Sequence, residues 1–277
     1  MNILDSYRGT ALVTGASSGL GARTAELLAE RGYRVIGAAR RVEAIRKLPG
    51  VVAVQLDLTD GSSIEHAVRT VESEHGPIDM LVNDAGYGEF GSIEETPLES
   101  ARRQFEVNVF GLAALTARVI PMMRAAGAGR IVNVSSLAGE FSSPLGGWYH
   151  ASKFALEAIS ASLRAEVRPF GIDVVSVQPG PVRTPWHDEA MRSLESVSGN
   201  GPYREMATAV AAYHRSSQDT AITSDVDKVA EVIVRAATSR RPRSRYRVGR
   251  GSSTAVALSR LPDRVFDAMT RRQFGIG

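Results

Sequence analysis

The sequence predicts an α/β fold: a doubly wound parallel sheet in a single domain. Short apolar runs rich in β-branched residues alternate along the chain with longer helical patterns. The runs lack the polar alternation of strands that keep one face in water. Strands buried on both faces and separated by helices form a parallel sheet with helices on either side. A chain of 277 residues is long enough for one large core.

The expected strands and helices follow one another in order. Strands are predicted over residues 10–14, 33–38, 51–56, 78–82, 130–134 and 172–177. Helical patterns cover residues 61–75, 98–126 and 148–170, and a further one follows the first strand. Asp225 is a suitable N-cap for a helix that runs to about Thr238, and residues 245–248 complete the series as a last strand.

Two segments depart from this alternation. Residues 185–224 show weak periodicity with scattered glycine and proline, and they include the bulky Trp186 and Tyr203. We expect a substrate-loop insertion over the carboxyl edge of the sheet. Residues 250–277 form a C-terminal extension whose apolar side chains would pack on the domain or on a second subunit. Neither segment has the composition of a linker, so residues 1–277 are predicted to form one domain.

Composition excludes several classes of protein. The chain has 43% hydrophobic and 23% charged residues, as soluble globular proteins do. It has neither a run of about 18 apolar residues nor the basic-then-apolar start of a signal peptide, so we expect a cytoplasmic protein with no membrane partner. There is no cysteine, and the five histidines fall at no metal-ligand spacing. We therefore expect neither a disulfide nor a metal site.

A basic cluster lies near the end of the predicted domain. The net charge is +3, and six arginines stand between positions 240 and 250. Such a segment is more often solvated or turned toward a protein partner than bound to nucleic acid. We expect no nucleic-acid partner; the alternative would show as salt-dependent binding of DNA or RNA.

A glycine-rich loop joins the first strand to the first helix, with glycine at positions 15, 19 and 21. Unpaired N–H groups and the helix dipole at such a position favour an anion such as a pyrophosphate. Glycine also lets the backbone approach that anion closely. An ordinary glycine turn is the alternative, which the strand-loop-helix context disfavours.

The end of the second strand indicates the type of dinucleotide. Dinucleotide-binding folds place there either an acidic side chain for a ribose hydroxyl or an arginine for a 2′-phosphate. Here Ala39 is followed by Arg40 and Arg41. We therefore expect NADP (NADPH) as cofactor rather than NAD, although two arginines would also suit an ordinary charged surface.

Tyr149 and Lys153 stand four residues apart in a helical stretch, so they share one face of the helix. A free tyrosine has a pKa of about 10, and a nearby positive charge lowers it. The pair thus predicts a phenol whose pKa is lowered for proton transfer. By itself the spacing is a weak signal.

Together these motifs resemble those of the classical short-chain dehydrogenases/reductases, over roughly residues 8 to 250. The loop matches that family's TGxxxGxG pattern, and Tyr149 and Lys153 match YxxxK. Ser136 stands 13 residues before Tyr149, as the family's catalytic serine does, and Asn108 matches its helix asparagine. The resemblance implies a Rossmann-like fold in which Asn108, Ser136, Tyr149 and Lys153 are catalytic.

The resemblance also implies the cofactor contacts. Asp57 would contact adenine, and the segment from Pro179 to Thr184 would close over the nicotinamide. The expected cofactor contacts are Gly15, Ser17, Ser18, Gly19, Leu20, Gly21, Arg40, Arg41, Asp57, Leu58, Asp84, Ala85, Gly86, Tyr149, Lys153, Pro179, Gly180, Val182 and Thr184.

One residue departs from the family's pattern. The family's NNAG sequence after the fourth strand is Asn83-Asp84-Ala85-Gly86 here. The second asparagine has a supporting role in the family, and an ionised carboxylate accepts hydrogen bonds but donates none. We expect Asp84→Asn to leave the fold intact and to change cofactor affinity at most modestly.

We expect an oxidoreductase that interconverts a carbonyl and a secondary or primary alcohol. Tyr149 would act as general acid and base, Lys153 would hold its charge state and bind the nicotinamide ribose, and Ser136 would hold the substrate oxygen. The resemblance alone assigns Asn108 the positioning of a water beside Lys153. Two alternatives stay open: a non-catalytic NADP-binding sensor or scaffold, and an epimerase or dehydratase that uses the cofactor transiently.

The substrate and the assembly are predicted in outline. Mostly aromatic or apolar residues are expected around the nicotinamide: Tyr87, Phe90, Leu137, Phe141, Trp148 and Trp186. They favour a small apolar ketone, aldehyde or alcohol as partner, although large aromatic residues also build cores. The family commonly pairs subunits through its long helices, so we expect a homo-oligomer, either a dimer or a tetramer.

Overall fold

The computed structural model describes residues 7–276; residues 1–6 and 277, which the predicted domain includes, lie outside this range. Seven strands form one sheet in the order β3-β2-β1-β4-β5-β6-β7, and every neighbouring pair is parallel. The strands are β1 (Thr10–Thr14), β2 (Arg34–Ala39), β3 (Val51–Gln55), β4 (Met80–Asn83), β5 (Gly129–Val134), β6 (Ile172–Pro179) and β7 (Arg245–Val248). The predicted doubly wound parallel sheet is confirmed.

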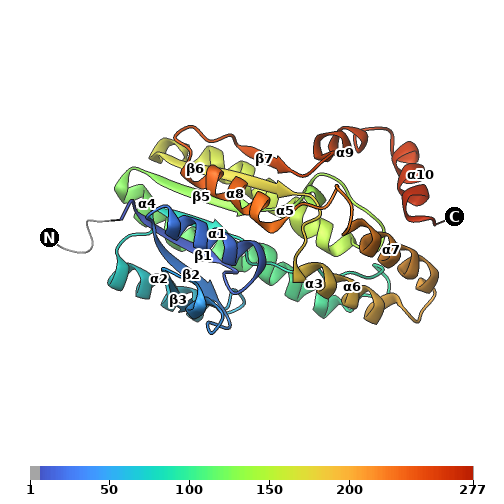
Figure 1. The fold of residues 1–277 in the computed structure, drawn as a ribbon, viewed down its shortest axis with the longest axis horizontal. Coiled ribbons are helices and arrows are strands. Elements are labelled where there is room, and N and C mark those ends of the chain that lie inside the picture. Colours follow the sequence, from blue (N-terminus) through green and yellow to red (C-terminus); the bar gives the residue numbers. More distant parts are fainter. Residues whose placement is uncertain (1–6, 277) are drawn as a thin grey trace.

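Helices cover both faces of this sheet (Figure 1). The helices α1 (Gly19–Glu30) and α8 (Val226–Thr238) pack side by side on one face. The other face carries α2 (Gly61–His75), α4 (Leu112–Ala126) and α5 (Gly147–Val167). The predicted site residues on α1 and α5 therefore approach the sheet from opposite faces.

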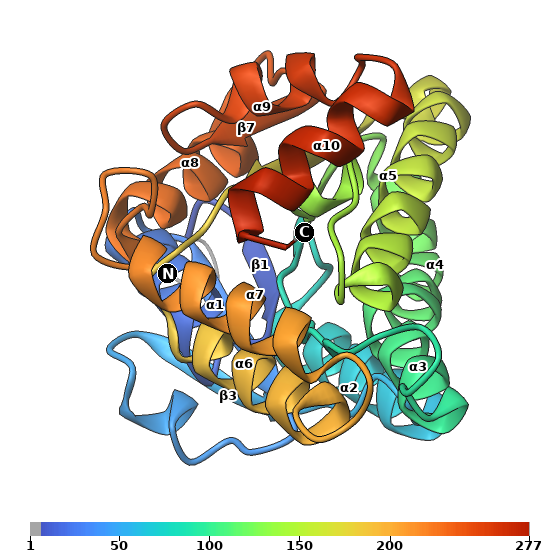
Figure 2. The same cartoon turned by 90° about the vertical axis from the view of Figure 1, so that its right-hand side faces the viewer.

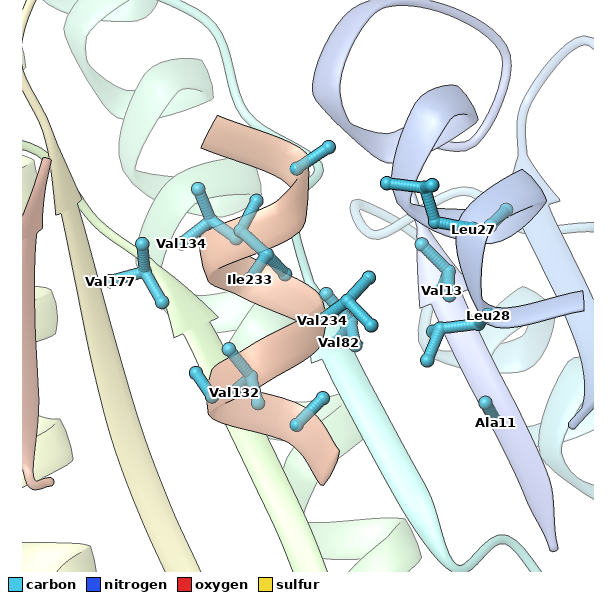
Figure 3. Packing of buried hydrophobic residues seen from close by; sticks show 14 of the residues in the cluster. Ala11, Val13, Leu27, Leu28, Val82, Val132, Val134, Val177, Ile233 and Val234 are labelled. Atoms are coloured by element: carbon cyan, nitrogen blue, oxygen red, sulfur yellow. The ribbon is translucent and has the colours of Figure 1, made fainter. Parts of the chain in front are cut away.

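Alternate residues of each strand supply the two hydrophobic cores. Ala11 and Val13 of β1 pack toward α1 and α8, where Leu28 and Ile233 are fully buried (Figure 3). Leu12, between them, points into the core on the opposite face. Because side chains alternate along a strand and both faces are covered, the strands read as continuous apolar runs.

The stretch predicted as one long helix is divided into three parts. It consists of α3 (Leu98–Phe105), a π-helical segment (Glu106–Gly111) and α4. A Cβ on Gly111 would lie 2.1 Å from the carbonyl oxygen of Leu58, so the π segment packs directly on the loop after β3. Residues 98–126 are long and apolar enough to cross a membrane by length and composition alone. In this structure α4 packs on α2 and β5, and 39% of the most apolar part of the segment is buried.

The predicted insertion contains two helices that sequence periodicity missed. These are α6 (Pro185–Ser198) and α7 (Arg204–Ser217), which pack against each other. Buried side chains of α6 recur at helical spacing, at His187, Ala190, Met191 and Leu194. Together with α9 (Ser252–Leu258) and α10 (Asp263–Phe274), they lie at the end of the molecule where the strands terminate (Figure 2).

Two arginines of the basic cluster at residues 240–250 form ion pairs within the protein. Arg245 Nε lies 3.1 Å from Glu157 Oε2, and Arg247 Nη2 lies 3.4 Å from Glu140 Oε1. Gln178 Nε2 donates to the same Glu140 oxygen over 2.7 Å. Both arginines remain exposed, as expected of a solvated segment, and they also pair with acidic groups of α5 and of the loop after β5 that face the edge strand β7.

Candidate active site

A hollow of about 1130 Å³ opens at the carboxyl ends of the strands. Typical pockets for one small ligand measure about 300–1,000 Å³, so this hollow has room for a cofactor and a second small molecule. All the predicted cofactor and catalytic residues line it except Gly21 and Asn108. Sequence motifs that are spread over 170 positions therefore meet in one place.

The glycine loop has the conformation that its sequence predicts. Gly15 has a φ of +71°, and a Cβ on it would lie 2.9 Å from the backbone nitrogen of Ala85. A Cβ on Gly21 would lie 2.5 Å from the carbonyl oxygen of Gly15. The first turn of α1 carries no acidic residue. The loop thus offers an anion the free N–H groups of a helix N-terminus without a competing carboxylate in that turn.

Thr14, at the end of β1, joins this loop to the segment after β4. Its hydroxyl accepts hydrogen bonds of 3.1 Å from the backbone nitrogens of Asp84 and Ala85, and it donates to the carbonyl oxygen of Val82 over 3.4 Å. The sequence analysis did not assign this role. The sequence could have indicated this role, because Thr14 is the first residue of the matched TGxxxGxG pattern.

The carboxyl group of Asp84 lies behind the glycine loop. A Cβ on Gly21 would come within 2.8 Å of Asp84 Oδ2. Burial raises the pKa of Asp84 to about 7, against the opposing effects of the Lys153 charge and of a hydrogen bond from the Gly21 N–H. Aspartate in place of the asparagine of the NNAG pattern therefore puts a titratable group between the glycine loop and Lys153.

The two arginines lie at the end of the hollow where the sequence predicts the adenosine of the cofactor. Arg40 and Arg41 are exposed and line it. Asp57 accepts hydrogen bonds from the backbone and hydroxyl of Thr59 over 2.9 and 2.8 Å. These bonds, with the charge of Arg40, hold the pKa of Asp57 below its ordinary value although burial opposes them. Asp57 therefore remains a carboxylate beside Arg40.

Tyr149 is 8% exposed, at the first turn of α5. Burial raises its pKa to about 12, and a hydrogen bond with the Ser136 side chain counteracts only part of that rise. The predicted lowering of this pKa is therefore wrong, because burial penalises the charged phenolate and dominates the pKa of Tyr149. The Lys153 Nζ atom lies 5.9 Å from the centre of the tyrosine ring.

Lys153 reaches the interior one turn further along α5. It is 7% exposed, and its Nζ donates to the carbonyl oxygen of Val134 over 3.1 Å. Burial lowers its pKa to about 8, while the charges of Asp84 and Glu157 act in the opposite direction. The ammonium group is thus held between the end of β5 and the carboxyl group of Asp84.

Ser136 is fixed by the backbone on both sides of the hollow. Its hydroxyl accepts from the backbone nitrogen of Ala138 over 3.1 Å and donates to the carbonyl oxygen of Pro179 over 3.5 Å. Pro179 ends β6 and begins the segment expected to cover the nicotinamide. The serine, the tyrosine and that segment are therefore positioned together.

Asn108 lies in the π-helical segment, and its side chain is fully engaged. Its Nδ2 donates to the carbonyl oxygen of Tyr87 over 2.9 Å and to Ser152 Oγ over 3.1 Å, and its Oδ1 accepts from the Tyr87 nitrogen over 3.1 Å. A Cβ on Gly86 would lie 3.0 Å from Asn108 Oδ1 and 3.9 Å from Lys153 Nζ. The side chain therefore holds the Gly86–Tyr87 backbone beside Lys153.

Aromatic rings close the hollow around Tyr149. The ring centre of Tyr149 lies 5.5 Å from that of Phe90 and 5.1 Å from that of Trp186. Of the aromatic and apolar residues expected here, Tyr87, Phe90, Leu137, Phe141 and Trp186 line the hollow.

The expectation for Trp148 is wrong, because its ring turns away and packs edge-on against Phe105 at 6.4 Å. Its position directly before Tyr149 puts it on a different face of α5.

Comparison with known proteins agrees with this geometry. The family model for short chain dehydrogenases matches residues 9–194. The chain belongs to the short-chain dehydrogenase family. It is therefore an oxidoreductase of that family, and the resemblance stated from the motifs is confirmed.

Individual relatives extend the match beyond the family model. The chain is 32% identical to a probable short-chain type dehydrogenase/reductase, VdlC, of Helicobacter pylori, over 94% of this chain and 96% of that one. It is 41% identical to the 3-ketodihydrosphingosine reductase of Bacteroides thetaiotaomicron, over 68% of each chain. A solved short-chain dehydrogenase from Streptomyces avermitilis superposes with a TM-score of 0.75 and 33% identity, covering 96% of this chain and 97% of that one.

Proposed function

We propose that this short-chain dehydrogenase is an NADP-dependent carbonyl reductase and alcohol dehydrogenase with Tyr149 as its proton donor and acceptor. The observation that carries the proposal is the meeting of Ser136, Tyr149 and Lys153 with the glycine loop on the wall of one hollow. A site that only binds a dinucleotide needs no buried phenol beside a buried ammonium, so the sensor or scaffold alternative leaves the pair unexplained.

The residues present fit a dinucleotide with a 2′-phosphate. The N-terminus of α1 is free of acidic side chains in its first turn, which suits a pyrophosphate. Arg40 and Arg41 stand exposed at the other end of the same hollow, where they would pair with the 2′-phosphate. Asp57 would contact the adenine, and Lys153 would bind the ribose hydroxyls of the nicotinamide half.

The bound cofactor supplies or accepts the hydride, and the side chains of this chain manage the substrate oxygen. Ser136 and Tyr149 donate hydrogen bonds to that oxygen and hold it at the nicotinamide side of the hollow. As the oxygen gains negative charge, Tyr149 transfers its proton to it. The Lys153 ammonium stabilises the phenolate that remains. Phe90 and Trp186 exclude water from the reacting atoms.

A substrate with an apolar body suits the aromatic walls. The Bacteroides relative is named for reducing 3-ketodihydrosphingosine, a ketone on a long alkyl chain. We therefore include long-chain ketones in the substrate class of this protein, beside the smaller apolar ketones, aldehydes and alcohols.

The experiment follows NADPH absorbance with a panel of apolar ketones and aldehydes. Wild type should consume NADPH steadily, and Tyr149→Phe should reduce kcat by at least about a hundredfold, which is the usual contribution of a general acid, while NADPH binding persists. Near-normal turnover by Tyr149→Phe would contradict the mechanism. An epimerase or dehydratase would convert its substrate with no net consumption of NADPH.

We also propose that the protein works as a homo-oligomer paired through its long helices. Phe110 in the π-helical segment and Phe154 on α5 are 57% and 44% exposed. Large apolar side chains on one surface favour burial against a partner. Sedimentation of the purified chain tests this: a purely monomeric protein would contradict it.

A further inference from the structure

The C-terminal extension forms part of the wall of the active-site hollow. The helix α10 crosses the end of the molecule where the strands terminate (Figure 2). Its last residues, Gln273 and Phe274, line the hollow that also contains Tyr149. Nearer its start, Phe266 packs edge-on against Phe141 with ring centres 6.1 Å apart.

Phe274 is the one side chain of α10 that the domain buries. It is 7% exposed, whereas Met269 on the same helix is 39% exposed. The ring of Phe274 meets Tyr213 edge-on at 4.9 Å, and Gln273 Nε2 donates to the Tyr213 hydroxyl over 2.5 Å. The end of α10 is therefore positioned on α7, the helix that sequence periodicity did not predict.

A continuous path of rings leads from the proton donor to this helix. The ring centres of Tyr149 and Phe90 are 5.5 Å apart, those of Phe90 and His214 6.2 Å, and those of His214 and Phe274 6.0 Å. All four side chains line the hollow. A molecule whose carbonyl meets Tyr149 can therefore extend along these rings until it reaches Phe274.

The two histidines at this end of the hollow are neutral near pH 7. Burial lowers the pKa of His214 to about 4, together with smaller effects of the neighbouring His187 and His150. Burial likewise lowers the pKa of His187, although the charge of Asp188 opposes that effect. Neutral imidazoles and aromatic rings suit an alkyl chain and leave a charged tail without a partner.

We propose that Phe274 is a specificity-determining residue, the end wall that limits the length of an apolar substrate chain extending from Tyr149 to α10. The proposal rests on the carbonyl chemistry proposed above and adds the direction in which the substrate lies. It assigns a role to the C-terminal extension: this segment completes the substrate site of its own subunit.

A series of straight-chain methyl ketones tests the wall. In wild type, kcat/KM should rise by roughly fourfold for each added methylene that the hollow buries, and it should stop rising once the chain meets Phe274. Phe274→Ala should move that limit to longer ketones, and Phe274→Leu, which retains more bulk, should move it less. Met269→Ala, on the exposed face of α10, should keep the wild-type limit.

Two controls distinguish a change in the length limit from misfolding of the variant. Each variant should bind NADPH with wild-type affinity, because Phe274 packs on Tyr213 and His214 rather than on the residues expected to bind the cofactor. The kcat/KM of the shortest ketones should also change little. If Phe274→Ala shows the same length limit as wild type while binding NADPH normally, the proposal is wrong.

The reactivity of a cysteine introduced at position 274 tests whether the ketone reaches this position, and this test needs no catalytic turnover. The chain has no cysteine, so Phe274→Cys introduces the only thiol, and its rate of reaction with a disulfide reagent can be followed by absorbance. A long methyl ketone should slow that reaction, while the thiol introduced by Met269→Cys should react at one rate with or without ketone. Equal rates at position 274 would overturn the proposal.

The two assays distinguish failure of this inference from failure of the proposed function. If no carbonyl compound is reduced but the ketone still protects the thiol at position 274, then the ketone binds beside residue 274 and only the proposed reductase activity is wrong. If ketones are reduced, but Phe274→Ala keeps the wild-type length limit and the thiol of Phe274→Cys is not protected, then the proposed activity is supported and the proposed role of Phe274 is wrong.

Discussion

Asp84→Asn should make the stability of this protein less dependent on pH. The pKa of Asp84 is raised from an ordinary 3.8 to about 7 by burial. A carboxyl group with a raised pKa stabilises the fold fully below the unfolded value, and that contribution is lost as pH rises through the folded value. At about 1.36 kcal/mol per pKa unit, roughly 4 kcal/mol is lost between about pH 4 and pH 8. Asparagine keeps the shape and does not titrate.

The expected difference can be measured between pH 5 and pH 8. The advantage of Asp84→Asn over wild type in the free energy of unfolding should grow by about 2–3 kcal/mol over that interval, or roughly 5–10 °C in melting temperature for a domain of this size. The change between the two pH values is the quantity to compare, because effects of the substitution that do not depend on pH then cancel. Removing this carboxylate also lowers the pKa of Lys153, which increases the variant's advantage in the same direction as pH rises.

Denaturant unfolding monitored by circular dichroism at several pH values provides the assay. Asp219→Asn is a matched control, because Asp219 is exposed in the loop after α7, and its stability should follow wild type at every pH. Parallel curves for wild type and Asp84→Asn would refute the reasoning. A large loss of stability at pH 8 would refute it more strongly, since it would mean that the ionised carboxylate supports the fold.

Two further predictions concern other charged groups. Arg40→Ala should weaken NADPH binding tenfold or more, the value of one charge-assisted contact, and leave NADH binding unchanged; thermal shifts with each cofactor measure this, and equal losses for both would contradict it. Glu157→Ala should cost about 1–3 kcal/mol of unfolding free energy, because the buried Ser176 hydroxyl and the Arg245 guanidinium both bond that carboxylate. Denaturant unfolding measures it, and an unchanged midpoint would contradict it.

The sequence predicted those parts of the fold that local rules decide. The strand β1 reads as apolar without alternation because both of its faces are covered, which identifies the parallel sheet directly. The glycine loop is recognisable because φ values of +71° at Gly15 and +57° at Gly19 suit few other residues. In both cases the constraint acts on a few neighbouring residues, so the local sequence is enough to predict the structure.

Features that depend on distant contacts were less predictable. The helices α6 and α7 are each 14 residues long, and the glycine and proline residues at their ends concealed their periodicity. Trp148 precedes Tyr149 in sequence, and only the orientation of α5 decides that one ring turns to Phe105 and the other to the hollow. The place of Phe274 in the wall depends on the path of the whole C-terminal extension, which no motif predicts.

The electrostatics of Tyr149 favour one direction of the reaction. Lowering its pKa from about 12 to 7 would require about 7 kcal/mol. A single ammonium at about the 5.9 Å that separates Lys153 Nζ from the ring centre supplies only about 3 kcal/mol at an effective dielectric constant of about 20. Tyr149 is therefore a protonated phenol at neutral pH. In the mechanism proposed above, this phenol would protonate an alkoxide, a far stronger base, whereas removing a proton from an alcohol would require the phenolate. We infer that carbonyl reduction is the faster direction near pH 7 and that alcohol oxidation gains on it as pH rises.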